Sequence, residues 1–476
     1  MISRQEVMDF SREFGLSSNV IEKDYVLGWV LAGIANHSIL GSEWVFKGGT
    51  CLKKCYFETY RFSEDLDFTV TTANNLNPEL LTNIFQEISD WIYESTGIEI
   101  PKDTISFEVY SNSRGTLSAQ GKISYRGPLQ RRDNLTRIKL DLTTDEIVAL
   151  NPVSREVHHP YSDKPDDGIN VQSYCFEELF AEKIRALEER LRPRDLYDVI
   201  HLYRHNTAVD RSLLMATLEK KCEFKGIPTP TMELLENMPE KAELTGEWEN
   251  MLGHQLPVLP PFEQFWSELP AVFEWIYRSI QKVTPLSMPS MGMPVDTTWQ
   301  LPVMSQAWHT STPLETIRYA AANRLCVNLM YNRSLRLIEP YSLRRTSDGN
   351  LLLYAVKHTT GENRSYRVDR IQGVTVTSVP FTPRYAIELT AAGYVSVPAI
   401  KSREPTLRSL TAKTTKPTRS RSNKKSLSSG PKYVFRCSLC GKLFTHTSYN
   451  AKIGEHKNKQ GYSCFGSIGI YVTTKY

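Results

Sequence analysis

The stretch of sequence that decides the fold is VFKGGTCLKKCYFETYRFSEDLDFTV, residues 45–70. An apolar run typical of a β-strand leads into Gly48 and Gly49, and a run typical of a helix follows them. Two glycines at such a turn let the backbone approach a ligand closely, and the next amides can hold phosphate oxygens. A Gly-Gly pair alone can equally be an ordinary turn, so its meaning depends on its surroundings.

The last six residues of this stretch, DLDFTV (65–70), alternate between polar and apolar side chains. In a β-strand this alternation places Asp65 and Asp67 on one face and the apolar side chains on the other. Two carboxylates about 7 Å apart on one face repel each other unless a cation lies beside them, and hard divalent cations prefer such oxygen ligands. A solvated edge strand with two surface acids would show the same pattern.

A third carboxylate stands in a similar run, RIKLDL (137–142), where Asp141 shares a face with Lys139. If this strand pairs beside the first, Asp141 completes a three-carboxylate site for two metal ions. Such ions would activate an attacking oxygen and stabilise a leaving pyrophosphate. The sequence alone does not establish the pairing.

A cation and two further acids follow in predicted helices. Residues 176–191 place apolar side chains at i, i+3 and i+4 spacing, and Lys183 lies within that apolar stripe. A lysine there either contacts an anion such as a triphosphate or extends along the stripe edge to reach water. Pro193 then starts another helix, where Asp195 and Asp198 suit the positive first turn, so capping alone could explain either aspartate.

These motifs occur in a specific order, and together they resemble a known family. The ordered set is similar to the AbiEii/AbiGii-type nucleotidyltransferase toxins, relatives of the MenT toxins with a DNA polymerase β-like core, over about residues 1–280. The motifs are EKDY (22–25), FKGGTCL (46–52), RFSEDLD (61–67), EK (182–183) and RDLYD (194–198). Cys51 departs from the usual Ser or Ala, which is a small change in size.

The resemblance implies an α+β fold, with a polymerase β-like nucleotidyltransferase core and a helical C-terminal part. It also implies a role for each matching residue. Asp65 and Asp67 would bind Mg²⁺, with Asp141 as the third acid, Lys183 would contact the triphosphate, and Asp195 would be a further essential acid and candidate general base. The implied nucleotide-binding residues are Gly48, Gly49, Thr50, Lys53, Arg61, Ser63 and Lys183.

The activity implied is Mg²⁺-dependent transfer of NMP from an NTP to an RNA acceptor, such as a tRNA 3′ end. Such enzymes are the toxins of toxin–antitoxin or phage-defence pairs, so an antitoxin is the expected partner. Two other readings stay open. The acceptor could be a protein hydroxyl, or the chain could be a nucleic-acid-binding regulator with an inactive transferase fold.

Residues 315–382 are typical of short strands separated by turns at 347–350 and 359–362. This part looks like a WYL domain, a small Sm/SH3-like β-barrel whose members bind nucleic acids or nucleotides, although Leu replaces the expected Trp. A barrel with a solvated arginine face would fit equally. The candidate anion contacts are Tyr331, Arg344, Arg364, Arg367 and Arg370.

The C-terminal part carries a C-x-x-C-G motif, Cys437 to Gly441, which is typical of a zinc knuckle. His456 and Cys464 would complete a Cys₃His site, with His446 as the competing fourth ligand. A module of about 44 residues usually needs a metal to fold. It would contact nucleic acid or, alternatively, protein.

The amino-acid composition indicates where the positive charge is concentrated and in which compartment the protein is expected. The 476 residues have a net charge of +4, but residues 401–432 hold ten basic residues and one acid, so this segment alone carries +9. A polyanionic partner such as RNA fits that segment, which has too few apolar side chains to order itself. No apolar run approaches the roughly 20 residues of a membrane span, and the N-terminus lacks a secretory pattern, so we expect a cytoplasmic protein.

The expected organisation has five parts. They are a nucleotidyltransferase domain at 1–283, a linker at 284–313, a WYL-like domain at 314–390, a basic disordered linker at 401–432, and a zinc-binding module at 433–476.

Overall fold

The computed structural model describes most of the chain before residue 390 and short segments after residue 431. The chain falls into two units, Met1–Ile400 and Lys401–Tyr476, and each is described by itself. The described residues are 1–14, 16–57, 61–111, 114–130, 135–205, 209–278, 286–292, 294–296, 314–389, 432–437, 442–446, 450–454, 456–457, 463–464 and 469–475.

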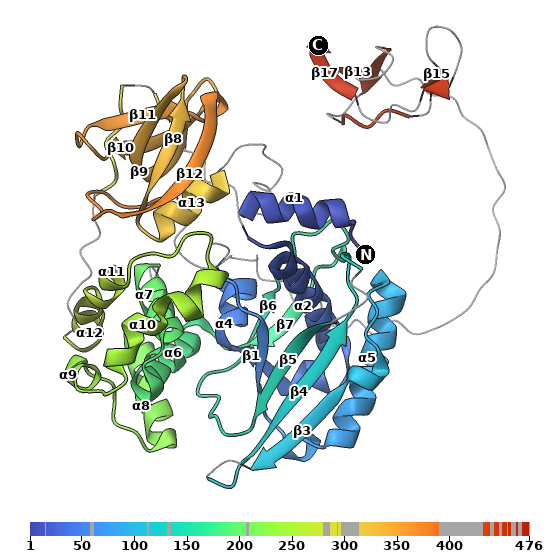
Figure 1. Cartoon of the computed structure of the whole chain (residues 1–476), viewed down its shortest axis with the longest axis vertical. Helices are drawn as coiled ribbons and strands as arrows, with labels where there is room; N and C mark the ends of the chain where they lie inside the picture. Colours follow the sequence, from blue (N-terminus) through green and yellow to red (C-terminus); the bar gives the residue numbers. More distant parts are fainter. Residues whose placement is uncertain are drawn as a thin grey trace, which may run out of the picture. The chain divides into compact units, whose positions relative to one another are not determined.

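A mixed seven-stranded sheet forms the centre of the first unit, in the order β3-β4-β5-β2-β1-β7-β6 (Figure 1). The pairs β2–β5 and β1–β7 are parallel, and the other neighbours are antiparallel. Both strands predicted to carry carboxylates are therefore present and adjacent. The strands are β1 (Trp44–Lys47), β2 (Asp65–Val70), β3 (Ser106–Ser111), β4 (Leu117–Tyr125), β5 (Thr136–Thr143), β6 (Val153–Glu156) and β7 (Asn170–Ser173).

Helices α2 and α5 cover the apolar face of this sheet, because the alternating strands turn their large side chains toward them. Phe85 of α5 packs on Trp44 and Phe107, and Trp29 of α2 packs on Trp91 of α5. The opposite face carries the carboxylates. The helices are α1 (Arg4–Phe14), α2 (Ser18–Asn36), α3 (Leu40–Glu43), α4 (Gly48–Cys51), the π-helix η1 (Leu52–Tyr56) and α5 (Pro78–Thr96).

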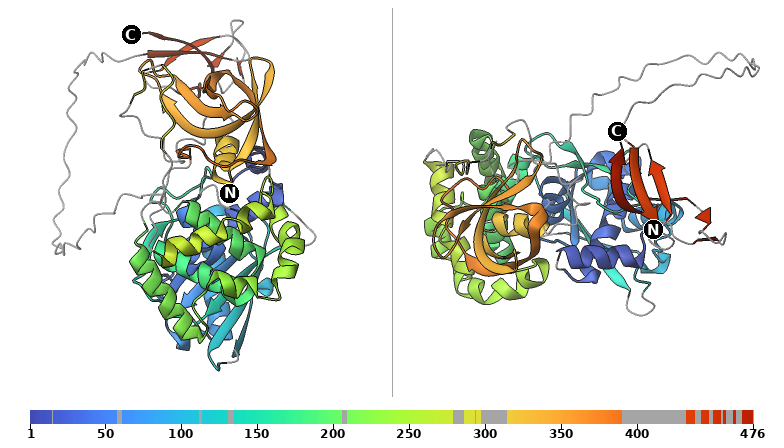
Figure 2. Two further views of the ribbon diagram at one scale, coloured as in Figure 1. Left: turned by 90° about the vertical axis from the view of Figure 1, so that its left-hand side faces the viewer. Right: turned by 90° about the horizontal axis from the view of Figure 1, so that it is seen from above.

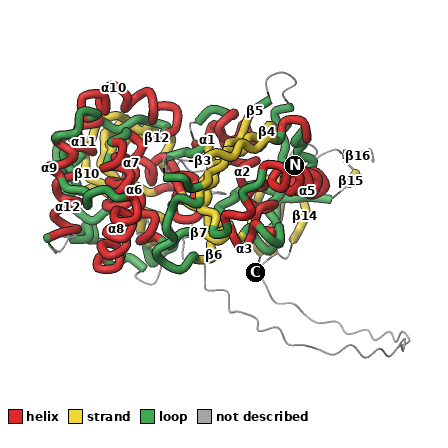
Figure 3. The backbone as a smooth tube through the Cα atoms, turned by 90° about the horizontal axis from the view of Figure 1, so that it is seen from below, coloured by secondary structure: helices red, strands yellow, loops and turns green. Residues whose placement is uncertain are grey.

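A group of helices follows the sheet and gathers apart from α2 and α5 (Figure 3). The predicted helix over 176–191 is α6, and the predicted start at Pro193 begins α7, so both predictions are confirmed. The group consists of α6 (Phe176–Arg190), α7 (Pro193–Arg204), α8 (Arg211–Lys225), α9 (Met232–Glu236), α10 (Lys241–Leu252), α11 (Phe262–Trp266) and α12 (Leu269–Tyr277).

The last part of the first unit is a five-stranded antiparallel sheet in the order β11-β10-β9-β8-β12, seen curling in Figure 2. The predicted turns are present, with Gly349 and Gly361 at φ +81° and +70°. The prediction of strands alone was wrong at the start of this part, because its Ala-rich opening forms a helix. The elements are α13 (Leu314–Ala322), β8 (Leu325–Tyr331), β9 (Ser334–Arg345), β10 (Leu351–Lys357), β11 (Asn363–Arg367) and β12 (Ile371–Pro380).

Part of the expected linker packs on this sheet. Met288 is buried in the core of the sheet and its carbonyl accepts a hydrogen bond from Arg344, while Asp296 forms an ion pair with Arg345. The remainder of 284–313, apart from 286–292 and 294–296, lies outside the described residues. The description as a plain linker therefore does not hold for these two segments.

The second unit contains two small antiparallel sheets. The first has the order β14-β13-β17, and the second pairs β15 with β16. The strands are β13 (Lys432–Cys437), β14 (Leu443–His446), β15 (His456–Lys457), β16 (Ser463–Cys464) and β17 (Gly469–Lys475). In the described part of the whole chain, no helix is both long and apolar enough to cross a membrane.

Candidate active site

The three predicted carboxylates share one face of the central sheet. In the parallel β2–β5 pair, Asp67 lies opposite Asp141 and Asp65 lies opposite Lys139. Cross-strand partners point to the same face, so the chain folds these acids into one cluster. Gln120 of β4 donates from Nε2 to Oδ1 of Asp141 at 3.2 Å, which orients that carboxylate and leaves its second oxygen available.

The Gly-Gly turn lies directly against this cluster. Gly48 has φ +79°, and a Cβ there would lie 2.1 Å from Oδ2 of Asp67. A Cβ on Gly49 would lie 2.8 Å from a terminal nitrogen of Arg61 and 3.0 Å from the Ser63 hydroxyl. The turn therefore requires glycine for both conformation and space. It brings backbone amides, a guanidinium and a hydroxyl beside the carboxylates.

Two predicted nucleotide contacts are placed differently. The Thr50 hydroxyl is buried and donates to the Asp65 carbonyl, so it joins α4 to β2. Lys53 places Nζ 4.6 Å from the centroid of the Phe62 ring and lines a cavity of about 270 Å³ with Glu315 and other residues of α1, α13 and β12. The structure does not bring Lys53 to the carboxylates.

The two aspartates of β2 have pKa values above that of an isolated aspartate. Burial raises the pKa of Asp67 to about 7; Lys47 opposes the rise and Asp141 adds to it. Burial also raises the pKa of Asp65, where Lys23 opposes the shift and Asp141 reinforces it. A divalent cation among these oxygens would remove the mutual repulsion. Asp67 and its cross-strand partner Asp141, with Asp65 further along β2, supply the type of oxygen that a magnesium ion prefers. In the described part of the chain, however, no three acidic, His or Cys side chains are already gathered around one metal position.

Lys183 does lie near this cluster, but its closest partner is Asp198. The lysine is 8% exposed, and its Nζ is 2.7 Å from Oδ2 of Asp198. Arg61 binds the same carboxylate through two nitrogens at 2.7 and 2.8 Å and donates to Gln255. Burial alone would raise the pKa of Asp198, yet Arg61 and Lys183 hold it below its usual range. Asp198 thus positions two cations beside the Gly-Gly turn, a role that sequence reasoning missed.

Asp195, the candidate general base, is fully buried and engaged. Both of its oxygens accept hydrogen bonds from Arg190, at 2.7 and 2.8 Å. This pair joins the end of α6 to the start of α7. It gives Asp195 an evident structural partner, while its role in proton transfer stays a prediction.

Lys47 is a second residue that sequence reasoning left without a role. It ends β1, lies opposite Asp67 in the β1–β2 register, and forms an ion pair with Glu182 at 3.1 Å. Although burial would lower it, the pKa of Lys47 is raised by Glu182, Glu146 and Asp67. The position of Lys47 directly before the Gly-Gly turn is the sequence feature that could have identified it as a site residue.

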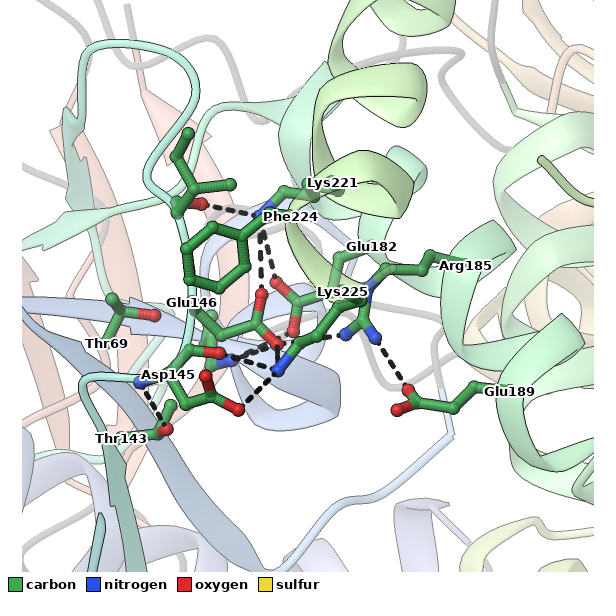
Figure 4. Close-up of polar contacts among 12 residues, drawn as sticks. Thr69, Thr143, Asp145, Glu146, Glu182, Arg185, Glu189, Lys221, Phe224 and Lys225 are labelled. Carbon is green, nitrogen blue, oxygen red and sulfur yellow. Dashed lines mark hydrogen bonds and ion pairs between the residues drawn. The ribbon is translucent and has the colours of Figure 1, made fainter. Parts of the chain in front are cut away.

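Beyond Lys47 extends a buried network of alternating charges, drawn in Figure 4. It joins the segment after β5 to α6 and α8, so it fixes the helices against the carboxylate strands. Distances of 3.0 to 3.9 Å connect Lys221 to Glu178, Glu182 and Glu146, and Lys225 and Arg185 to Glu146.

Arg194 is a further cation at this site. It stands in the first turn of α7, and its Nε is buried with no hydrogen-bond partner among the described residues. Burial and the nearby Arg61 lower the pKa of Arg194, while Asp65 and Asp198 act in the opposite direction. A guanidinium so placed could accept a phosphate.

The other predicted sites are placed only in part. In the WYL-like sheet, Arg344, Arg364 and Arg367 form ion pairs with Glu388, Glu362 and Asp369, and the Tyr331 hydroxyl accepts a hydrogen bond from the Arg367 amide. Arg370 follows in a short 3₁₀ turn. Of the zinc candidates, Cys437 is buried, Cys440 lies outside the described residues, and His456 pairs with Cys464 across β15–β16. His446 is opposite Tyr433.

A comparison with family models decides the family. Residues 29–277, more than half of the chain, match the model described as nucleotidyl transferase AbiEii toxin, type IV TA system. The chain belongs to the AbiEii nucleotidyltransferase toxin family. Residues 313–376 of this AbiEii-family protein match the WYL domain. Membership of this family of nucleotidyltransferase toxins implies an NTP substrate, a divalent metal ion and the context of a toxin–antitoxin system.

Comparison with solved structures gives more distant similarities. MenT4, a nucleotidyltransferase toxin from Mycobacterium tuberculosis, is 16% identical over 60% of this chain and 91% of its own, with a TM-score of 0.40. A putative nucleotidyltransferase from H. pylori is 15% identical over 56% and 97%, with a TM-score of 0.34. A comparison with curated proteins found no match. The family assignment of the AbiEii-family chain rests on the family model.

Proposed function

We propose that this protein transfers NMP from an NTP to the 3′ end of an RNA, with tRNA as the first acceptor to test, in a Mg²⁺-dependent reaction. The observation that carries the proposal is the contact of the Gly48 backbone with Asp67, at the position where Asp67 lies opposite Asp141. A turn suited to phosphate thereby adjoins oxygens suited to a metal. The family context supplies the NTP and the antitoxin.

The residues have distinct proposed roles. Asp65, Asp67 and Asp141 hold Mg²⁺, which when bound polarises the α-phosphate and neutralises the leaving pyrophosphate. The Gly48–Gly49 amides orient the phosphates, and Ser63 lies beside them.

Arg61, Lys183 and Arg194 supply positive charge for the leaving group. In the reaction, the acceptor 3′ oxygen forms a bond to the α-phosphorus. The bond between the α-phosphorus and the oxygen that bridges it to the β-phosphate breaks, and pyrophosphate leaves. We propose Asp141 as the proton acceptor in place of Asp195, because Gln120 engages only one oxygen of Asp141, whereas both oxygens of Asp195 accept hydrogen bonds from Arg190.

The test is incubation with radiolabelled NTPs, total tRNA and Mg²⁺, comparing wild type with Asp67→Ala. We expect label on RNA with the wild type and none with the variant. Label found on protein alone would replace the RNA acceptor by a protein hydroxyl. Equal labelling by Asp67→Ala would refute the metal assignment.

The second unit is proposed to bind structural zinc through Cys437, Cys440, His456 and Cys464. The Cys437 amide donates to the Lys442 carbonyl at 2.8 Å, so the facing ends of β13 and β14 are held together next to Cys437. The Nδ1 of His456 lies 2.9 Å from the Gly454 carbonyl, a contact that orients the imidazole ring.

The remaining proposals concern organisation. We assign the transferase to 1–283 and the WYL-like domain to 314–390, with the latter and the C-terminal module contacting nucleic acid, in a cytoplasmic protein. The +9 segment at 401–432 supports such contact.

A further inference from the structure

A row of cations continues the carboxylate face of the sheet toward its β3–β4 edge. Lys139 lies opposite Asp65 on one side and opposite Lys122 of β4 on the other. Two residues earlier in β5, Arg137 lies opposite Ser124. Because cross-strand partners and alternate residues share a face, Lys122, Arg137 and Lys139 lie on the same surface as the three acids. We call these three residues the β4–β5 cation row.

The cation row is open to solvent. Arg137 and Lys139 are exposed, and neither side chain forms an ion pair or a hydrogen bond with a residue that the structure describes. Lys122 is half-buried and pairs with Glu108 at 3.3 Å at the outer edge. The opposite face of these strands is committed to the core, where Ile123, Ile138 and Leu140 are buried. Among the described residues, Arg137 and Lys139 therefore have no structural partner comparable to the one that Lys183 has in Asp198.

A polyanionic acceptor needs positive charge along its path to the carboxylate cluster. A 3′ end must bring its terminal hydroxyl to the carboxylate cluster while the preceding phosphates trail behind it. The trailing phosphates carry one negative charge each, so a positive surface along their path would stabilise the bound acceptor. The pKa of Asp65 responds to Lys139, so this charge is close enough to matter. Lys139, the cross-strand partner of Asp65, and Arg137, two residues earlier in β5, supply such a positive surface.

We propose that the β4–β5 cation row binds the phosphates just upstream of the 3′ end of a single-stranded RNA acceptor. This inference rests on the proposed function and specifies where its acceptor lies. The cation row belongs to the first unit, so this contact is distinct from the sequence-independent RNA binding proposed for residues of the second unit.

The test uses Lys122→Ala/Arg137→Ala in the full-length protein. Lys139 is left in place, because its charge also affects Asp65. The matched control is Lys102→Ala/Lys220→Ala, which removes two exposed cations from the 3₁₀ turn η3 (Lys102–Thr104) and from α8.

The first readout is kcat/KM for a short single-stranded oligoribonucleotide as a function of KCl. We expect a loss of about tenfold or more at low salt, and a log–log salt slope about 1.4 smaller because two phosphate contacts are lost at ~0.7 each. The KM for NTP should stay within about twofold of wild type. An unchanged RNA dependence, or a control variant that loses as much, would overturn the inference.

The second readout does not need turnover, so it separates this inference from the proposed function. An RNA carrying 4-thiouridine next to its 3′ end is photocrosslinked, and the labelled peptides are mapped. Crosslinks to residues of β4 or β5 that disappear in the double variant support the row even if no RNA is extended. Crosslinks only elsewhere contradict it, whichever acceptor the enzyme uses.

Discussion

Replacing Asp67 by Asn should stabilise the metal-free protein and abolish its activity. Burial raises the pKa of Asp67 from 3.8 to about 7. The folded protein therefore binds this proton more tightly than the unfolded chain does. The resulting destabilisation develops as the pH rises from about 4 to about 7, and it is complete above that range. Asn carries no charge and avoids the penalty.

The magnitude follows from the shift. A rise of about three pKa units corresponds to an upper bound of about 4 kcal/mol at pH 8. The side chain is half-buried rather than fully enclosed, so we expect about 2 kcal/mol. In a domain of this size that raises Tm by about 4–8 °C. At pH 5 most of the gain should be absent.

The assay is thermal unfolding in EDTA at pH 5 and pH 8, for wild type, Asp67→Asn and the control Asp90→Asn. Asp90 is an exposed residue of α5 that pairs with Lys102. Added Mg²⁺ should then raise the Tm of wild type but not of Asp67→Asn. A variant that is no more stable than wild type at pH 8, or equally stabilised at both pH values, would refute the reasoning.

Three further changes have expected outcomes. Gly48→Ala should lose most transferase activity, because the new Cβ would meet Asp67. The matched control is Gly97→Ala, since Gly97 also has φ +79° but open space around a Cβ. This control should keep its activity and lower the free energy of unfolding by only about 1–2 kcal/mol. Asp198→Asn should lower stability by about 3–5 kcal/mol, seen as a large drop in Tm, because it leaves two buried cations without their shared carboxylate; a variant as stable as wild type would contradict that network. Zinc analysis of the purified protein should find one ion per chain and none in Cys437→Ser, and equal zinc in both would exclude the proposed site.

The sequence was informative where local chemistry decides the structure. Alternation in 65–70 and 137–142 predicted two strands, and Pro193 predicted the start of α7, because period and turn preference depend on near neighbours. The AbiEii resemblance, later supported by the family model, came from short motifs in a fixed order.

The sequence could not predict which side chains from distant parts of the chain form ion pairs. Lys183 was recognised as unusual in its apolar stripe, but its partner Asp198 lies on another helix and was taken for a capping residue. The family resemblance made Lys53 a candidate nucleotide contact, but the helical turns through η1 carry it away from the acids to Phe62. The helix α13 was missed because a strand-rich neighbourhood was extended over it.

The central claim is that Asp65, Asp67 and Asp141 hold divalent cations beside the Gly48 turn. The most direct test is a crystal structure with Mn²⁺ and a non-hydrolysable NTP, with the anomalous signal measured at the manganese edge. We predict anomalous peaks within about 2.3 Å of carboxylate oxygens of Asp65 and Asp67, with triphosphate oxygens as further ligands. Peaks confined to other sites, with both aspartates free of metal, would contradict the account.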